Sequence, residues 1–87
     1  VLELADLLRS RDLLLAAETA ALAHKLANGP TLAYGLARKA VLAGLECDLD
    51  SALANEAAGQ RIAGASQDCG EAIAAFMAKR APVFSGE

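Results

Sequence analysis

Residues 66–86 of the chain read SQDCGEAIAAFMAKRAPVFSG, a stretch that carries start and stop signals for one helix. Starting at Asp68, the sequence DCGE has the spacing of a capping box, in which two side chains satisfy free amides of the first turn. Lys79 and Arg80 follow an Ala-rich run, at the end where cations favour the helix dipole. The stretch predicts a helix that starts at Ser66 or Asp68 and ends near Arg80.

The residues after this helix are predicted to fold back onto the protein. Pro82 stops the helix because its ring lacks an amide proton and clashes with the preceding turn. The tail Val83–Gly86 is apolar enough that we expect it to dock. Within the helix, Phe76 and Arg80 are four residues apart and are expected to share one face.

Upstream of this stretch, apolar residues recur at helical spacing between short breaks rich in Gly, Pro and Asp. Asn28-Gly29 is expected to form a left-handed C-terminal turn, and Pro30 ends the helix before it. Asp48 or Asp50 is expected to start a later helix. The segment from about Leu2 to Leu8 is expected to be a short amphipathic turn or a strand-to-helix connection. The three helices predicted here span residues 11–27, 31–43 and 49–63.

Composition favours an all-α fold class with four main helices. Of 87 residues, 22 are Ala and 15 are Leu, which are strong helix formers, whereas aromatic and β-branched residues are scarce. A chain of this length buries only about 60–65% of its unfolded surface, and so much Ala makes the core thin. Because the chain also begins at Val1 instead of Met, we expect it to be part of a larger protein.

The helix at residues 31–43 is apolar almost all round, and only Arg38 and Lys39 carry charge. A helix without a polar face is normally covered on more than one side. We therefore expect contact with another domain or another subunit.

Charge and cysteine content argue against several classes of protein. The net charge is −3 with no basic stripe, so we expect no nucleic-acid partner. The longest run without charge, Leu26–Ala37, is too short to cross a bilayer, and no signal-peptide pattern is present. We therefore expect no membrane partner. Cys47 and Cys69 lack metal-ligand spacing, which favours a reducing, cytoplasmic location and no metal site. A disulfide between these two cysteines stays open.

Two other places could carry chemistry. His24 is the only histidine, and it is interpreted as a half-exposed helix residue because no suitable partner lies near it. Glu56 and Gln60 lie one turn apart beside apolar positions, so Glu56 could be an acid or base with a raised pKa. The favoured interpretation is a rim residue paired with Arg61 or Arg38.

The segment Asp50–Leu53 reads Asp-Ser-Ala-Leu and resembles the Asp-Ser-Leu motif of acyl carrier proteins, which carry phosphopantetheine on the serine. Ala52 replaces the leucine, and the following helix has one acidic residue where carrier helices have many. Helix capping explains Ser51 well enough. A stand-alone helical carrier or interaction module is therefore kept as the alternative function.

The stretch at residues 66–86 resembles the C-terminus of the enoyl-CoA hydratase/isomerase (crotonase) superfamily, which has an acidic start, Glu-Gly, Ala-Phe, Lys-Arg, then Pro and Phe-x-Gly. Residues 22–30, LAHKLANGP, are similar to the family's helix before its Gly-Pro or Ser-Pro break. Lys39 and the pair Glu56 and Gln60 match a common lysine and the family's Glu-x-x-x-Gln pattern.

This resemblance extends from about Leu13 to Gly86, with departures at Ala72, where the family has Gly, and Ala78, where Glu is common. The ending Phe-x-Ala-Lys-Arg-x-Pro-x-Phe-x-Gly is most similar to the phenylacetate-pathway isomerase branch. The choice between hydratase, isomerase and other crotonase chemistry stays open.

The resemblance implies that residues 1–87 are the C-terminal helical, trimerisation region of an acyl-CoA hydratase or isomerase. Family members hold the acyl-CoA in an N-terminal spiral of β-β-α units and form trimers, often dimers of trimers. Their carbonyl-polarising amides and acidic proton-transfer groups belong to the spiral domain. The expectation for this chain is therefore no catalytic residue, no metal and no cofactor other than the CoA of the substrate.

The resemblance also implies that Phe76 and Lys79 contact CoA, because the last helix of one subunit reaches the neighbour's CoA pocket. Phe76 would pack on the adenine side, and Lys79 would approach a phosphate, that of the ribose being favoured. The alternative is that Phe76 belongs to the core and Lys79 only complements the helix C-terminus.

Overall fold

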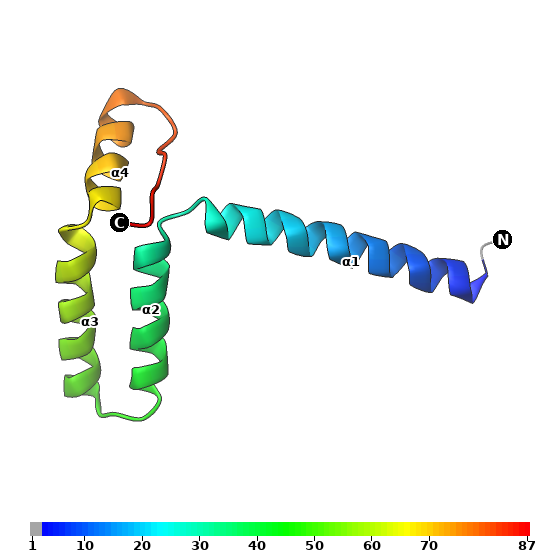
Figure 1. The fold of residues 1–87 in the computed structure, drawn as a ribbon. Helices are drawn as coiled ribbons and strands as arrows, with labels where there is room; N and C mark the ends of the chain where they lie inside the picture. The colour runs from blue at the N-terminus through cyan, green and yellow to red at the C-terminus, as the bar shows by residue number, and fades with distance from the viewer. Residues whose placement is uncertain (1–2) are drawn as a thin grey trace.

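The computed structural model describes residues 3–87 and consists of helices, with no strand in that range (Figure 1). The predicted all-α fold class with four main helices is confirmed. Two of the helices start and end within one residue of their predicted bounds. The helices are α1 (Leu4–Ala27), α2 (Thr31–Gly44), α3 (Leu49–Gly64) and α4 (Gln67–Ala78).

The N-terminal third is one continuous helix, which corrects the separate turn or strand-to-helix connection predicted for Leu2 to Leu8. α1 begins at Leu4 and continues to Ala27, while Val1 and Leu2 lie outside the described residues. Most residues here are Leu, Ala and Arg, which favour helix regardless of which side they face. Asp6 and Arg9 also form an ion pair of 3.4 Å across one turn of α1.

The junction between α1 and α2 lacks the predicted left-handed turn. Asn28 has φ −90° and ψ 0°, and among the described glycines only Gly86 has positive φ. Gly29 instead lies close to Tyr34, since a Cβ there would meet the ring and hydroxyl of Tyr34 and the ring would have to shift. Pro30 then precedes the first residue of α2, where a missing amide proton costs nothing.

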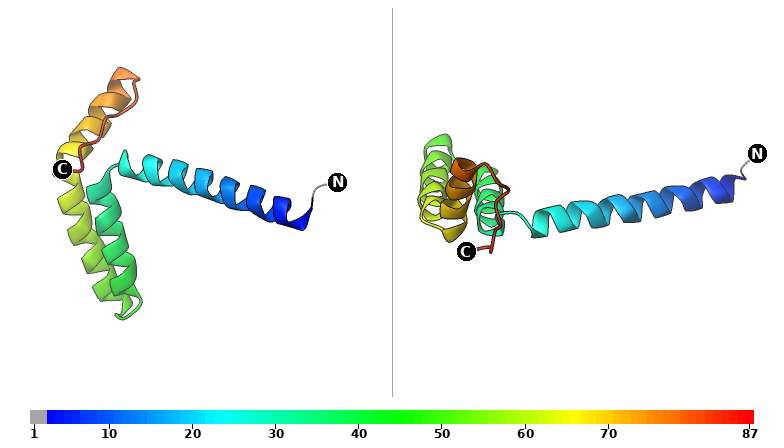
Figure 2. Two further views of the ribbon diagram at one scale, coloured as in Figure 1. Left: turned by 45° about the vertical axis from the view of Figure 1, so that its right-hand side comes forward. Right: turned by 90° about the horizontal axis from the view of Figure 1, so that it is seen from above.

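α2 and α3 form an antiparallel hairpin, and α1 extends away from it (Figures 1 and 2). Small residues let the two helices approach, so that a Cβ on Gly59 would lie 3.9 Å from that of Leu36. Asp48 is the residue that starts α3, since its carboxylate accepts the amide of Ser51 at 2.7 Å. This hydrogen bond lowers the pKa of Asp48.

The segment has almost no core of its own. Ala75 and Asp68 are the buried residues of the described chain, and every leucine of α1 is exposed. The radius of gyration is 19.0 Å, where a compact chain of this length has about 12 Å. The accessible surface is 7130 Å², where a compact protein of the same mass exposes about 4,800 Å². The chain therefore exposes about 2,300 Å² more than a self-sufficient domain would.

Several smaller expectations can be placed on this fold. His24 is exposed on α1, and Cys47 and Cys69 are both free thiols, the first exposed and the second half-buried. Within residues 3–87, none of the helices is both long and apolar enough to span a bilayer.

Candidate functional site

The start of α4 is formed by Ser66. Its hydroxyl accepts the amide of Cys69 at 3.1 Å and donates to the carbonyl of Ala63 at 2.6 Å. Ser66 therefore serves both as the N-cap of α4 and as a bridge back to α3. The predicted capping box of Asp68 and Glu71 is wrong, and these two carboxylates bind other groups.

The end of α4 is a left-handed turn at Lys79, whose φ and ψ are 55° and 43°. The amide of Arg80 donates to the carbonyl of Ala75 at 3.0 Å, which closes the helix end as in a Schellman motif. Lys79 and Arg80 lie beyond the last turn, so their predicted position in that turn is wrong. The turn also takes Arg80 off the helix face that it was predicted to share with Phe76.

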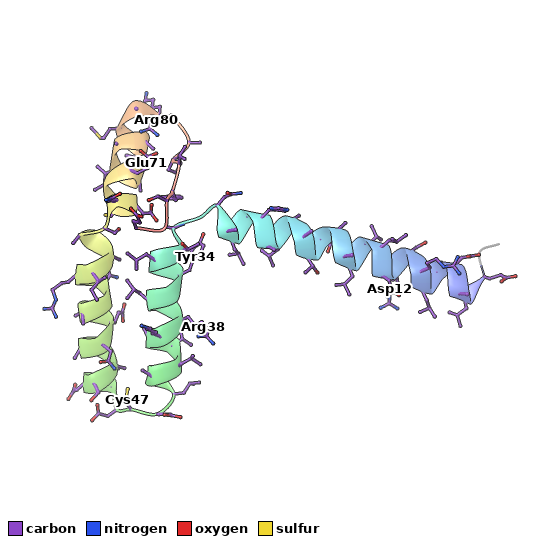
Figure 3. All side chains as sticks on the ribbon, in the orientation of Figure 1. Asp12, Tyr34, Arg38, Cys47, Glu71 and Arg80 are labelled. Carbon is purple, nitrogen blue, oxygen red and sulfur yellow. The ribbon has the colours of Figure 1, made fainter. Side chains whose placement is uncertain are left out.

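Glu71 holds the chain that leaves this turn. Its carboxylate accepts two hydrogen bonds from the Arg80 guanidinium, at 2.7 and 2.9 Å, and one from the Val83 amide at 2.7 Å. Figure 3 shows Glu71 and Arg80 close together at the α4 end of the molecule. The bonds from Arg80 and Val83 lower the pKa of Glu71 from 4.5 to about 2.

Asp68 holds the end of the tail, one helical turn before Glu71. Only 3% of Asp68 is exposed, and its carboxylate accepts the amides of Ser85 at 2.7 Å and Gly86 at 2.9 Å. The Asp68 amide donates to the carbonyl of Glu87 at 2.7 Å. Gly86 has φ +83°, and a Cβ there would lie 2.7 Å from the hydroxyl of Thr31 at the start of α2.

We call this arrangement the C-terminal clasp: Asp68 and Glu71 on α4, and the tail 80–87 that they bind. Figures 1 and 2 show the tail returning along α4 to the end that meets α2 and α3. The predicted docking of the tail is confirmed. Carboxylate-to-amide hydrogen bonds hold it, however, and Val83 stays 79% exposed.

The two predicted CoA-contacting residues lie at the outer end of α4. Phe76 is 82% exposed, so it packs in no core formed by residues 3–87 alone. Ile73 and Met77 are exposed beside it at helical spacing, and Lys79 is exposed at the left-handed turn that follows. An accessible aromatic ring and an accessible cation therefore occur within four residues.

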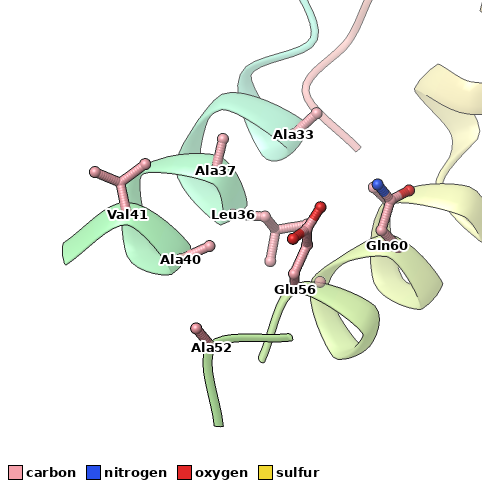
Figure 4. A pocket seen from close by; sticks show the side chains of 10 residues that line it. Ala33, Leu36, Ala37, Ala40, Val41, Ala52, Glu56 and Gln60 are labelled. Atoms are coloured by element: carbon pink, nitrogen blue, oxygen red, sulfur yellow. The ribbon is translucent and has the colours of Figure 1, made fainter. Parts of the chain in front are cut away.

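A second candidate site is a groove of about 540 Å³ between α2 and α3, where Glu56 and Gln60 project from α3 (Figure 4). In the described chain Glu56 forms no ion pair with Arg61 or Arg38, so the predicted pairing is wrong. Short apolar side chains form most of the groove, and a single carboxylate lines it. No group of His, Cys, Asp and Glu with metal-binding geometry occurs among residues 3–87. The other lining residues are Ala33, Leu36, Ala37, Ala40, Val41, Ala52, Gly59 and Ala63.

Comparison with known proteins gives a consistent result, although no family model matches the chain. The 1,2-epoxyphenylacetyl-CoA isomerase of Escherichia coli is 42% identical over 66 residues, which cover 76% of this chain and 25% of the relative. A Rhodobacter capsulatus protein named a probable enoyl-CoA hydratase is 44% identical over 64 residues, which cover 74% of this chain and 25% of that protein. A solved structure of an enoyl-CoA hydratase from Geobacillus kaustophilus superposes with a TM-score of 0.78 at 33% identity, over 83% of this chain and 27% of that one.

The chain matches the C-terminal helical region of members of the enoyl-CoA hydratase/isomerase family. It spans about a quarter of the length of the curated relatives that it matches. The family resemblance seen in residues 66–86 is therefore confirmed, and one relative is an isomerase of a phenylacetyl-CoA derivative. The comparisons favour this resemblance over the carrier alternative, because the relatives above are named as a hydratase and an isomerase.

Proposed function

We propose that this chain serves as the C-terminal region of an enzyme that hydrates or isomerises unsaturated acyl-CoA thioesters. The match to an isomerase and to hydratases at 33–44% identity carries the proposal. The proposal assigns no catalytic role to this chain, because the family resemblance puts the carbonyl-polarising amides and acidic groups in the N-terminal spiral domain. The role of residues 1–87 is to supply subunit contacts and a helix that contacts the CoA part of the substrate.

The subunit contacts are supported by the surface that the chain leaves uncovered. An excess of about 2,300 Å² corresponds to roughly three interfaces of the standard 800 Å² per partner. Much of the exposed surface is apolar, including Leu13, Leu15 and Leu22 of α1. The surface fits a homotrimer or a dimer of trimers, in which neighbouring subunits and the remainder of the same protein cover these residues.

The CoA contact is assigned to Phe76 and Lys79. CoA ends in an adenine base and a ribose phosphate, and an aromatic face with a nearby ammonium group complements both. Phe76 is the most exposed of the large apolar residues of the described chain, and the left-handed turn separates Lys79 from the helix body. Both side chains are accessible to a ligand bound by a neighbouring surface.

Steady-state kinetics of the full-length protein on crotonyl-CoA test this assignment. Lys79→Ala should raise KM about three- to tenfold, because a partly exposed charge–phosphate contact contributes about 1 kcal/mol. The kcat should stay unchanged, since the contact is equal in ground and transition states. Lys25→Ala, at an exposed lysine of α1, is the matched control and should change neither value.

A truncated substrate separates the phosphate contact from general damage to the enzyme. The pantetheine thioester of crotonate lacks the nucleotide. The Lys79→Ala variant should therefore have the same kcat and KM as the wild type on this substrate. An equal loss on both substrates would contradict the phosphate contact. A wild-type protein that turns over neither substrate would contradict the proposed function itself.

A further inference from the structure

We propose that Glu71 is a positioning residue for CoA: through Arg80 and Val83 it maintains the left-handed turn that presents Lys79 to the ribose phosphate. The inference rests on the proposed function, since it concerns the same CoA contact. Glu71 itself would touch no ligand, because its carboxylate is already occupied by the guanidinium and an amide of the tail.

The first argument is the backbone of Lys79. It is the only non-glycine residue with positive φ in the described part of the chain. Any residue with a Cβ is strained in this conformation, and helices normally end there on glycine. A lysine at a position where glycine is favoured indicates that the side chain is retained for a purpose other than the turn.

The second argument is that the clasp restrains the turn from its far side. On the helix side, Ala75 accepts the amide of Arg80 at 3.0 Å. On the tail side, Glu71 binds the guanidinium of Arg80 twice and the amide of Val83 once, all within 2.9 Å. Lys79 lies between these two anchors, so it cannot relax to right-handed φ without breaking at least one of them.

The third argument is where the anchors lie relative to the accessible face. Glu71 and Asp68 bind the tail along α4, while Phe76 stays 82% exposed. The tail therefore does not cover the predicted adenine-contacting ring. Without Glu71, the Arg80 side chain and residues 81–83 would lose the hydrogen bonds that hold them on α4, and Lys79 would sample more positions relative to Phe76.

Calorimetric binding of free CoA and of 3′-dephospho-CoA to the full-length protein tests the inference. The wild type should bind CoA about tenfold more tightly than dephospho-CoA, because only CoA carries the ribose phosphate. Glu71→Gln should reduce this preference to about threefold or less, with affinity for dephospho-CoA little changed. Glu46→Gln removes the same charge from an exposed residue outside any ion pair of the described chain and should keep the full preference.

The outcomes separate this inference from the proposed function. A Glu71→Gln protein that keeps the tenfold preference would overturn the positioning role while leaving the CoA contact intact. A wild type without any preference would overturn the Lys79 contact, and with it this inference. A wild type that binds neither nucleotide would overturn the proposed function.

Substitutions at Lys79 test the strained turn independently of Glu71. Lys79→Ala and Lys79→Gly both remove the ammonium group and should both lose the phosphate preference, whereas Lys79→Arg should retain most of it. Only glycine releases the backbone strain, so the Gly variant should melt about 2–4 °C above the Ala variant. Equal melting temperatures of these two variants would overturn the argument from strain.

Discussion

Asp68→Asn is the substitution for which the structure gives the largest local effect. The two carboxylate oxygens of Asp68 separately accept the amides of Ser85 and Gly86, at 2.7 and 2.9 Å. Asparagine keeps one acceptor, and its NH₂ group would face the second amide as donor against donor. Losing one charge-assisted bond and weakening the other costs about 2–4 kcal/mol for opening of the tail. This corresponds to about a 30- to 700-fold increase in the open population.

Hydrogen exchange of the peptide that covers residues 81–87 measures this population in the full-length protein. Asp68→Asn should accelerate exchange of the Ser85 and Gly86 amides by that factor, while exchange in α2 and α3 changes little. Asp50→Asn is the matched control, because Asp50 is an exposed acid in the first turn of α3. If Asp68→Asn left exchange of the tail within threefold of the wild-type rate, Asp68 would not be what holds the tail.

Three further predictions concern pH, a close contact and assembly. The pKa of Glu71 is lowered in the folded state, so the stability that its pair with Arg80 contributes is present above pH 4.5 and is lost as pH falls toward 2. The difference in melting temperature between wild type and Glu71→Gln should therefore vanish over that range. A difference that stays constant would refute the pairing. Gly29→Ala should destabilise the protein by about 1 kcal/mol because the half-exposed Tyr34 ring must move, and chemical denaturation should show no such cost in a Tyr34→Ala background. Sedimentation of the full-length protein at micromolar concentration should show a trimer or hexamer, and a well-folded monomer would contradict the proposed subunit contacts.

The helices that sequence predicts best are those with local start and stop chemistry. Pro30 and Asp48 mark the starts of α2 and α3, and each acts within one turn of its own position. Because the interactions are local, the residue types alone suffice to predict them. The bounds of α2 and α3 therefore follow from the sequence to within a residue.

Two predictions near the N-terminus are wrong because the same residue types are compatible with more than one local structure. Asn28-Gly29 is a typical left-handed pair, yet in the structure the missing side chain of Gly29 leaves space that the Tyr34 ring occupies. The segment from about Leu2 to Leu8 is predicted to be a short amphipathic turn or a strand-to-helix connection. Helix propensity and the Asp6–Arg9 pair nevertheless keep residues 4–8 in α1.

The C-terminal clasp shows the same limit at longer range. Asp68 and Glu71 fit a capping box, and acids near a helix start are favourable in either arrangement. Their actual partners lie 9–18 residues further along the chain, and the left-handed turn at Lys79 brings these partners back alongside α4. The spacing of residues in the sequence does not tell whether these acids cap their own helix or bind a tail that folds back onto it. The exposed Lys79 and Phe76 were found instead through the family motif that contains them.

The proposed function is tested most directly by liquid chromatography with mass spectrometry of acyl-CoA products, because retention time separates isomers of equal mass. Full-length protein would be incubated separately with crotonyl-CoA and with its unconjugated isomer vinylacetyl-CoA. The account predicts that crotonyl-CoA gains the mass of one water, or that vinylacetyl-CoA keeps its mass while its double bond moves into conjugation. Recovery of both thioesters unchanged at high enzyme concentration would contradict the account.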